Sequence, residues 1–596
     1  MKLLRLKLHT PFRSLQQGFE VHFLRDFDEA GMWAFSPWCL AGRNGSGKSN
    51  IMEALAAIFY HLDCMYLDYK PESFEPDIDK KGKVTSGFDR TRCEPDAFEL
   101  EYYFDTEEVY TEKNDTDEQT AHLAKIRIEK AKGQAPKVYR LNRPNSQKED
   151  NAPLSGQEIR QFLPEYIIGY SSGENEILSL PFLKMRFLHY DEYLDRLRNE
   201  LDYHRPEGRF IYADAGYSQA IFLANYLMQE EEVLEPYLDV LKIEKLEQFR
   251  IIIRRNEQVF RIADEEKEWK DGDFEGQEPD PAGLVELTSL LEGDEDLLKG
   301  KNKLLDKLKR CATTYSIEKD FYHFDYLVND ETKKAFRLLF DNDPVSLFQS
   351  FQILLTLNLF EVNTELKSEF YHSESLYVNE TVPVLASDKR IMRFKDFYVQ
   401  KQGVGELLTK SLSDGEHQFM HAIGLCLLFK DARGLFLLDE PETHLNPDWR
   451  ARFISVLRDC LDISKKKDEA SENDPDIKGK VLQDLLITSH SPFIISDCRK
   501  EQVLIFRKEK DTGEITCKRP DFATFGASVN QITIRVFGQL ETIGDYAREE
   551  LKKLEEDLDA GKDPDKLIAA ANEQFGDSVE KVMFINKALD KKGGDN

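Results

Sequence analysis

The chain has 596 residues, of which 41% are hydrophobic and 32% are charged, and its 111 acidic residues outnumber its 81 basic ones to give a net charge of -30. This length suggests about four domains, and the acidic excess excludes a surface that attracts nucleic acid over its whole area. The eight cysteines form no close pair, which indicates a reduced cytoplasmic protein, and no apolar run approaches the roughly 18 residues of a membrane-spanning helix.

The first 184 residues read as short strands around one strong helix. Alternating leucines at 3–8 and the apolar stretch 35–40 predict strands, and the second runs directly into AGRNGSGKSN. The helix IMEALAAIFYHL follows at 51–62. Further strands are predicted at 98–104, 124–128, 138–141 and 166–170, with polar loops between them.

The character of the sequence changes at about residue 185. Segments such as YLDRLRNEL, VLEPYLDVLKIEKLEQF and DLLKGKNKLLDKLKRC have helical spacing but no sustained heptads, so we expect a compact, mainly helical insertion over 185–399. Beyond residue 400, the pattern predicts helices at 417–428 and 447–460 and strands at 434–440, 481–490 and 503–509. Residues 541–596 form a charged, helical tail.

One glycine-rich segment predicts a phosphate-binding loop. Gly42-Arg-Asn-Gly-Ser-Gly-Lys-Ser49 matches G-x-x-x-x-G-K-[S/T] in full and lies between a predicted strand and a predicted helix. Its glycines let backbone N–H groups curve around a phosphate, and the start of the helix adds partial positive charge. Lys48 is expected to reach the β- and γ-phosphates and Ser49 to bind Mg²⁺. The predicted ATP-binding residues are Gly42, Asn44, Gly45, Ser46, Gly47, Lys48, Ser49 and Asn50.

Two predicted strands end in residues that could act on a bound nucleotide. The segment 434–440 reads GLFLLDE, and its apolar run is typical of a strand buried on both faces of a parallel sheet. Asp439 is therefore expected at the carboxyl end of the strand, where it holds Mg²⁺ through water, and Glu440 is expected to polarise the attacking water. A histidine after a strand is more often structural, but the motif order favours His490 as a γ-phosphate contact. The predicted catalytic residues are Lys48, Glu440 and His490.

The entry to the helix at 417–428 is unusual. It reads Ser-Leu-Ser-Asp-Gly-Glu at 411–416, with a glycine in the first turn that costs about 1 kcal/mol relative to alanine. A plain core helix has little reason to carry that glycine. We therefore expect the start of this helix to face a ligand.

Together these motifs resemble the ABC-type ATPases, in particular the soluble branch that includes SMC, RecF and OLD-family proteins. LSDGEHQ at 412–418 is similar to the signature motif, DEPETHLNP at 439–447 to the Walker B motif and D-loop, ITSHSP at 487–492 to the H-loop, and FRSL at 12–15 to an N-terminal strand motif. The resemblance implies an α/β ATPase head with a mixed sheet and an antiparallel β lobe. It also implies ATP and Mg²⁺ as cofactors and places Arg13 near the nucleotide.

The resemblance further implies a homodimer that encloses two ATP molecules. In this family the start of the signature helix contacts ATP held by the second subunit, which assigns that role to Ser413, Asp414, Gly415 and Glu416. Asp414 and Glu416 stand where many members have glycine and glutamine. No glutamine marks a Q-loop, and SSGENE at 171–176 offers Ser172 and Glu174 for that role.

The domain organisation follows from the spacing of the motifs. Residues 1–184 and 400–540 are expected to form the two halves of one ATPase head, divided by the insertion at 185–399 and followed by the tail at 541–596. More than half of the chain separates Ser49 from Ser413, which argues against a transporter ATPase, whose head is uninterrupted. FRSLQQGFEVHF, the phosphate-loop region and TFGASVNQITIRVFG are similar to restriction-system-associated AAA-family ATPases and to the Septu-type antiphage ATPase subunit.

Three functions are compatible with the sequence. The favoured one is an ATP-dependent sensor and scaffold in antiviral defence, which forms a dimer or larger oligomer and controls a separate effector such as an HNH-type nuclease. The second is a RecF- or SMC-like DNA-repair ATPase that contacts DNA directly, for which basic clusters at 250–261 and 301–309 are candidates. The third is a self-contained OLD-like nuclease, but the D-x-D of DLDAG at 557–561 lies within a charged helix.

Overall fold

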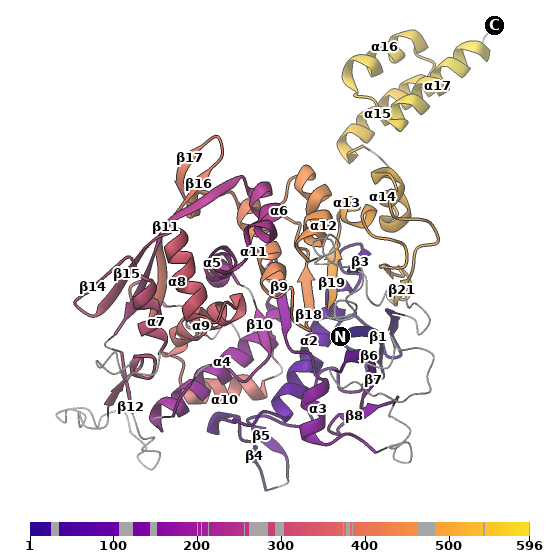
Figure 1. Cartoon of the computed structure of the whole chain (residues 1–596). Helices are drawn as coiled ribbons and strands as arrows, with labels where there is room; N and C mark the ends of the chain where they lie inside the picture. Colours follow the sequence, from indigo (N-terminus) through magenta and orange to yellow (C-terminus); the bar gives the residue numbers. More distant parts are fainter. Residues whose placement is uncertain are drawn as a thin grey trace, which may run out of the picture.

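The structure is a computed structural model, and it describes the chain except for residues 25–34, 81, 107–122, 143–151, 174, 200, 204, 213, 256, 261–283, 293–302, 374, 377–381, 384, 462–482, 540–542 and 595–596. The described residues form an α/β body with three large sheets and a helical C-terminal tail (Figure 1). None of the helices in these described segments is both long and apolar enough to cross a bilayer.

A seven-stranded sheet in the order β10-β9-β18-β19-β3-β20-β21 lies at the centre of the body. Its strands run parallel except for β21, which pairs antiparallel with β20 at one edge. The strands are β3 (Trp38–Gly42), β9 (Ile167–Ser171), β10 (Phe210–Tyr212), β18 (Leu435–Asp439), β19 (Asp484–Ser489), β20 (Val503–Lys508) and β21 (Ile515–Lys518).

Both faces of the central sheet are buried, which explains the uninterrupted apolar runs of its strands. Leu435 and Leu437 of β18 enter the core that contains α2, whereas Phe436 and Leu438 enter the core that contains α11. Alternation of this kind follows from the two-residue period of a strand. The covering helices are α2 (Lys48–Met65), α4 (Glu176–Arg198), α5 (Ser218–Met228), α11 (Asp414–Leu428), α12 (Pro447–Leu461), α13 (Pro492–Ser496) and α14 (Val529–Phe537).

A five-stranded antiparallel sheet forms the expected β lobe on the α2 side of the body. Its order is β2-β1-β6-β7-β8, and Leu6 of β1 lies opposite Leu100 of β6. The strands are β1 (Lys2–Leu8), β2 (Glu20–His22), β6 (Phe98–Asp105), β7 (Leu123–Lys130) and β8 (Lys137–Arg140). Near it lie α3 (Gly156–Phe162) and the hairpin β4 (Asp77–Ile78) and β5 (Val84–Ser86).

The segment 185–399, together with the residues that follow it up to 408, contains a third sheet as well as the expected helices. The sheet has the order β14-β15-β11-β16-β17, and the strands are β11 (Ile243–Arg254), β14 (Thr314–Glu318), β15 (Phe321–Leu327), β16 (Met392–Lys401) and β17 (Gly405–Leu408). A separate short pair consists of β12 (Gln258–Phe260) and β13 (Leu284–Glu286). The helices are α6 (Glu231–Leu241), α7 (Leu304–Cys311), α8 (Asp330–Leu339), α9 (Pro344–Thr356) and α10 (Thr364–His372).

The prediction of a continuous helix through VLEPYLDVLKIEKLEQF is wrong. The helix ends at Leu241, because Lys242 adopts a left-handed backbone conformation with φ of 54°, and the chain continues as the long strand β11. Residues 251–253 are all isoleucine, a β-branched residue that favours strands. The strand pairs with β15 and β16, which are distant in the sequence.

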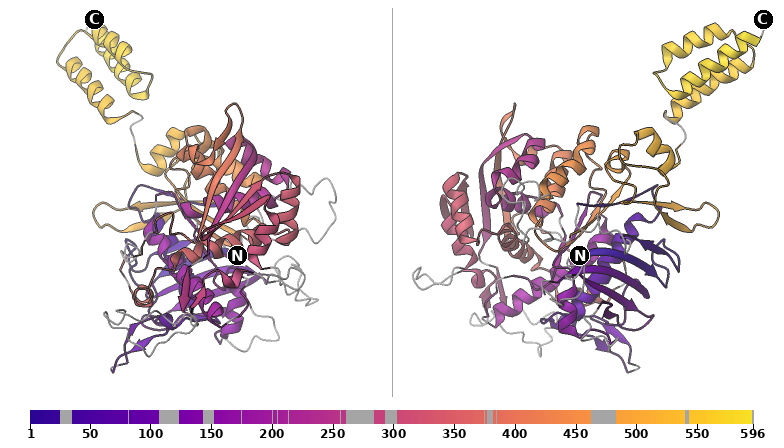
Figure 2. Two further views of the ribbon diagram at one scale, coloured as in Figure 1. Left: turned by 90° about the vertical axis from the view of Figure 1, so that its left-hand side faces the viewer. Right: turned by 45° about the vertical axis from the view of Figure 1, so that its right-hand side comes forward.

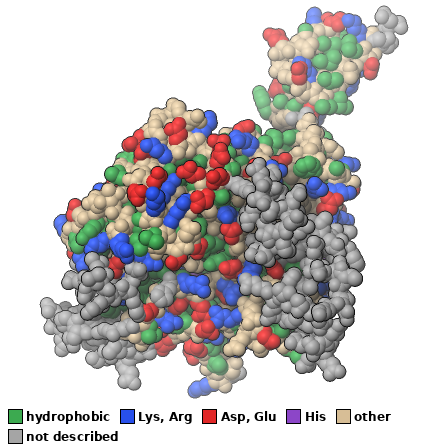
Figure 3. Space-filling model, in the orientation of Figure 1, with side chains coloured by type: hydrophobic (Ala, Val, Ile, Leu, Met, Phe, Trp, Pro, Cys, Tyr) green, Lys and Arg blue, Asp and Glu red, His purple; other side chains and the backbone are tan. Residues whose placement is uncertain are grey.

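The C-terminal tail folds into three helices with a small core of its own. The helices are α15 (Asp545–Asp559), α16 (Pro564–Gln574) and α17 (Val579–Gly594), and Leu551, Leu558 and Phe584 lie in the core. Figure 2 shows this unit projecting from the body beyond α14. On the face drawn in Figure 3, acidic and basic side chains are intermingled over the body.

Candidate nucleotide site

The phosphate-loop motif lies where the sequence predicts it, between β3 and α2. Gly42 is required because a Cβ atom there would collide with the backbone oxygen of Phe506 on the neighbouring strand. Lys48 donates to the backbone oxygens of Gly42, at 3.2 Å, and of Arg43, at 3.3 Å. The hydroxyl of Ser46 is buried in the loop without a protein partner. The loop therefore holds a lysine and an unpaired hydroxyl where a phosphate group would bind.

Asp439 gathers three donors at the carboxyl end of β18. Its carboxylate accepts from Ser49 Oγ at 2.8 Å, from Thr488 Oγ1 at 2.6 Å and from Asn175 Nδ2 at 3.0 Å. A serine hydroxyl beside a carboxylate is an oxygen donor set that suits Mg²⁺. Ser49 and Asp439 thus lie together as predicted, and Asn175 and Thr488 orient the carboxylate.

Glu440, His490 and Lys48 meet at the same edge of the sheet. His490 Nε2 lies 3.0 Å from Glu440 Oε1 and 2.9 Å from Lys48 Nζ. A single ring nitrogen can donate to the glutamate or accept from the lysine, but it cannot do both at once. The hydrogen bond from His490 lowers the pKa of Glu440, and nearby Lys48 adds to this effect. Glu440 is therefore ionised at neutral pH and able to accept a hydrogen bond from water.

The backbone of Glu440 is fixed from both sides. It has a φ of 48°, its N–H donates to Thr488 Oγ1 at 2.9 Å, and its carbonyl accepts from Ser172 Oγ at 2.6 Å. The hydroxyl of Ser172, one of the two Q-loop candidates, thus contacts the backbone of residues 440–446, which form the candidate catalytic loop between β18 and α12. Glu174, the other candidate, lies outside the described residues.

Sequence reasoning missed Thr488 and two further neighbours of the candidate nucleotide site, Asn175 and Arg43. Asn175 begins α4 by accepting from Leu178 N at 3.1 Å and also reaches Asp439. An asparagine that immediately precedes a helix is a recognisable N-cap, and this signal could have identified it. Arg43 donates to the backbone oxygens of Phe537 and Gly538 at the end of α14. That contact joins residues 494 and 495 positions apart, so local sequence patterns could not indicate it.

Arg13 of the FRSL motif lies against the first turns of α2. Its guanidinium is 2.7 Å from Glu94 and 3.7 Å from Glu53, which is buried. Asn50, which follows Ser49 in the chain, donates a hydrogen bond to Glu53 at 3.1 Å. Burial raises the pKa of Glu53. Its hydrogen bond with Asn50 and the positive charge of Arg13 act to lower that pKa, but burial has the larger effect.

The signature segment forms the capped start of α11. Ser413 accepts from Glu416 N, and the Glu416 side chain accepts from Ser413 N at 2.8 Å, so the two residues form a capping box. Partial burial would raise the pKa of Glu416, but hydrogen bonds from Lys401 and Ser413 outweigh it and lower that pKa. Ser413 and Asp414 are exposed.

Gly415 has a role within its own chain. A Cβ atom there would lie 2.8 Å from the backbone oxygen of His444, which belongs to the loop that follows Glu440. Gln418 strengthens this contact, because its side chain accepts from His444 N at 2.8 Å and lies 3.5 Å from the Glu440 carbonyl. The glycine therefore allows α11 to pack closely on the catalytic loop, a reason that the sequence alone did not reveal.

Three comparisons with known proteins found similar sequences and structures. The chain is 25% identical over 228 residues to "Protein ea59" of Escherichia phage lambda, and the alignment covers 38% of each chain, so this chain spans less than half of that relative's length. It is also similar to an SMC head domain from Thermotoga maritima, with 10% identity and a TM-score of 0.30, over 88% of this chain and 100% of that one. A further similar structure is an SmcHead bound to the C-winged helix domain of ScpA, with 11% identity and a TM-score of 0.33, over 87% of this chain and 98% of that one.

The family model named "AAA ATPase domain" matches residues 1–495. That range contains the phosphate loop, Asp439, Glu440, His490 and the start of α11. The chain therefore belongs to the AAA ATPase domain family.

Proposed function

We propose that this chain hydrolyses Mg-ATP between two copies of itself and uses the resulting dimer to control a separate effector. The proposal of hydrolysis rests on one observation: His490 Nε2 lies 2.9 Å from Lys48 Nζ and 3.0 Å from Glu440 Oε1, so the three side chains meet at one point. Glu440 accepts a proton or a hydrogen bond from the attacking water, and His490 aligns Glu440 while facing the terminal phosphate. Lys48 offsets the negative charge that develops on the phosphate oxygens.

Ser49 and Asp439 are the residues that would hold Mg²⁺. When bound, the ion would neutralise phosphate charge and fix the phosphate oxygens in place. Asn175 and Thr488 keep the Asp439 carboxylate turned toward Ser49 through bonds of 3.0 and 2.6 Å. The chain supplies this orientation before any substrate arrives, which reduces the reorganisation needed for the reaction.

Support for the dimer comes from the start of α11. The capping residue of this 15-residue helix, Ser413, is exposed, and helix starts favour anions. We propose that Ser413, Asp414, Gly415 and Glu416 of one copy face ATP held by the other. Each helix-dipole contact contributes only about 0.3–1 kcal/mol. Closure therefore depends on both nucleotides being bound.

Support for a separate effector comes from the tail. The D-x-D pair in DLDAG is engaged in ion pairs, since Asp559 lies 2.7 Å from Lys591 and Asp557 lies 2.8 Å from Lys562. These carboxylates stabilise the packing of the tail helices instead of facing a substrate. We propose that the effector is a nuclease such as an HNH-type enzyme, and that the system acts in the cytoplasm in antiviral defence.

The repair-type alternative finds less support in the basic cluster that begins at residue 250. Arg250 lies 2.6 Å from Asp325 and 3.4 Å from Asp396, and Arg254 lies 3.1 Å from Glu257. These pairs cancel much of the positive charge that DNA phosphates would need.

The dimer is tested by sedimentation velocity of a Glu440→Gln protein with and without Mg-ATP. We expect a dimer only with Mg-ATP, and we expect Ser413→Arg in the same background to abolish it. Ser155→Arg is the matched control, because Ser155 is also exposed and forms the same capping box with Glu158. Equal dimerisation of the Ser413→Arg and Ser155→Arg proteins would refute the proposed interface.

A further inference from the structure

The backbone of His490 is fixed by the central sheet, but its ring is not enclosed by protein. The residue directly follows the last residue of β19, and Ser491 N donates to Ser489 Oγ at 2.9 Å just before α13 begins. The side chain keeps 31% of its accessible surface. Burial alone therefore does not determine which way the imidazole points.

The orientation of this ring decides which groups its Nε2 atom can reach. That one nitrogen lies 2.9 Å from Lys48 Nζ and 3.0 Å from Glu440 Oε1. In many histidine sites, the second ring nitrogen holds the ring in place through a hydrogen bond of its own. Among the residues that the structure describes, none forms such a bond with His490 Nδ1. A ring anchored at one atom can still tilt about it, so packing must set its plane.

Phe537, the last residue of α14, supplies that packing. The ring centroids of His490 and Phe537 lie 6.2 Å apart, and the two ring planes make an angle of 28°. This offset, nearly parallel arrangement is one that aromatic rings favour. Phe537 is half-buried and packs against the core that contains α11, so its own position is fixed by that core.

The end of α14 is also tied to the phosphate loop and to the central sheet. Arg507 of β20 donates to the carbonyl of Arg535 at 2.6 Å. Arg43 of the phosphate loop donates to the carbonyls of Phe537 and Gly538. The last carbonyls of a helix have no partners within it, and arginine both satisfies them and complements the negative end of the helix dipole. The helix end that carries Phe537 is therefore held beside the phosphate loop.

From these contacts we propose that Phe537 is a positioning residue for ATP hydrolysis, which holds the imidazole of His490 so that Nε2 stays within reach of Glu440 and Lys48. The proposal rests on the hydrolysis proposed above and adds one residue to it. Phe537 acts through His490 and does not itself contact the nucleotide. This role also accounts for the segment TFGASVNQITIRVFG at 524–538, which contains α14 and ends next to Phe537.

The contact is tested by NMR of the full chain labelled with ¹³C at the Cε1 atom of histidine, in which His490→Gln identifies the His490 signal. An aromatic ring shifts the resonance of a proton held beside it. We expect the His490 signal to move in the Phe537→Ala and Phe537→Leu proteins and to stay near its wild-type position in Phe537→Tyr, which keeps the ring. A His490 signal that is identical in the Phe537→Ala and wild-type proteins would overturn the proposal.

The effect on the reaction is tested by steady-state hydrolysis of Mg-ATP. Phe537→Ala and Phe537→Leu should each lower kcat about 3- to 10-fold, as expected when one aromatic contact is lost. KM should stay within about twofold of the wild-type value, because both variants keep the backbone carbonyls that hold Arg43. Phe537→Tyr should retain the wild-type kcat. Wild-type kcat in Phe537→Leu would overturn the proposal, because apolar bulk would then suffice without a flat ring.

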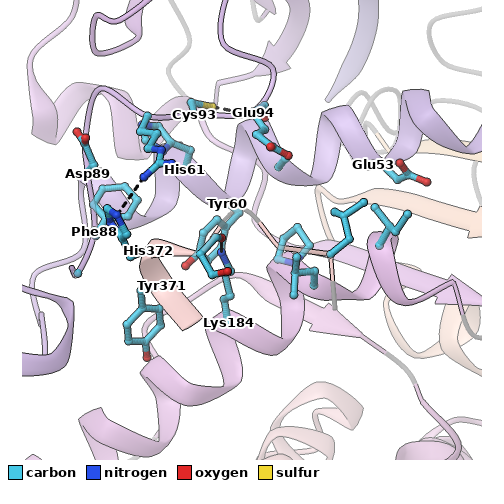
Figure 4. A pocket seen from close by; sticks show the side chains of 18 of the residues that line it. Glu53, Tyr60, His61, Phe88, Asp89, Cys93, Glu94, Lys184, Tyr371 and His372 are labelled. Carbon is cyan, nitrogen blue, oxygen red and sulfur yellow. Dashed lines mark hydrogen bonds between the residues drawn. The ribbon is translucent and has the colours of Figure 1, made fainter. Parts of the chain in front are cut away.

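Phe88→Ala is the matched control, because it also removes a phenyl ring from beside a histidine. Figure 4 shows Phe88 next to His61 at the cavity between α2 and α4, and their ring centroids lie 4.9 Å apart. His61 lies about 18 Å along α2 from Ser49, at 1.5 Å per residue. This variant should lower the thermal midpoint without lowering kcat or moving the His490 signal.

An equal fall of kcat in Phe88→Ala and Phe537→Ala would overturn the proposal, because a general loss of packing would then explain both. Failure of the wild-type protein to hydrolyse Mg-ATP would instead refute the proposed function. In that case the His490 signal would still decide whether Phe537 orients the ring.

Discussion

The carboxyl edge of the central sheet and the start of α11 differ in how completely their polar groups are matched within one chain. At the sheet edge, Asp439 accepts three hydrogen bonds and Glu440 pairs with His490. At the start of α11, Ser413 and Asp414 are exposed to solvent. The chemical groups are thus assembled by a single chain, whereas the helix start is a surface that a second body can contact. Four perturbations test this contrast.

The largest effect is expected at the sheet edge, from Glu440→Gln. The amide keeps the shape of the side chain but cannot accept a proton, so single-turnover ATP hydrolysis should fall at least about 100-fold. ATP binding should persist, because Lys48 and Ser49 are unchanged. Glu244→Gln, at an exposed position on β11, is the control and should hydrolyse ATP at the wild-type rate. A mutant that retains more than a tenth of that rate would exclude Glu440 from the chemistry.

The next largest effect concerns the helix start and can be measured by mixing two inactive proteins. Ser413→Arg and Glu440→Gln each spoil both sites of a homodimer, but both keep the phosphate loop that binds ATP, and their heterodimer keeps one intact composite site. An equimolar mixture should therefore recover about a quarter of the wild-type ATPase activity, since half of the dimers are mixed and each has one of two sites. Activity that stays at the level of the separate proteins would show that Ser413 does not act across subunits.

Most polar groups at the sheet edge described above have a hydrogen-bond partner, but Glu442 is an exception, because its Oε2 atom is buried without one. Burial raises the pKa of Glu442 to about 7, although a hydrogen bond from Ser489 opposes this. The folded protein therefore holds a proton that the unfolded chain releases near pH 4.5. The associated stability is complete below pH 4.5 and is lost as the pH rises to about 7, a change of about 3 kcal/mol at 1.36 kcal/mol per pKa unit.

Glu442→Gln should remove this pH dependence while leaving the other titrating groups in place. The difference in free energy of unfolding between pH 4.5 and pH 8, measured with urea, should change by about 3 kcal/mol relative to wild type. Identical pH profiles for the two proteins would mean that Glu442 ionises normally in the folded state.

The smallest effect is expected from Gly415→Ala, which places a methyl group 2.8 Å from the His444 backbone oxygen. We expect a loss of stability of about 1–3 kcal/mol, seen as a lower thermal midpoint. Gly576→Ala is the control, because a Cβ atom there meets nothing within 4 Å. An unchanged midpoint for Gly415→Ala would show that α11 and the catalytic loop do not pack closely in solution.

The positions of Asp439 and His490 at one edge of the sheet could be predicted, because each adjoins the end of a recognisable apolar strand. Asp439 ends β18 and His490 follows β19, and these strands are neighbours in a parallel sheet, so their ends meet. The contact between Arg43 and Phe537 could not be predicted, because nothing near either residue encodes it. The strand β11 was missed for the same reason, since its partners lie far away in the sequence and Lys242 gave no helix-ending signal.

The attachment of α11 to the catalytic loop has a consequence for how two ATP sites would work together. Gln418 contacts both His444 and the Glu440 carbonyl, so a shift at the start of α11 would displace the backbone that carries Glu440, the proposed hydrolytic residue. In the dimer that we propose, ATP held by one subunit would press on the helix of the other and thereby displace that other subunit's own Glu440. Turnover should then rise sigmoidally with ATP, with a Hill coefficient above one, and Gln418→Ala should reduce it toward one.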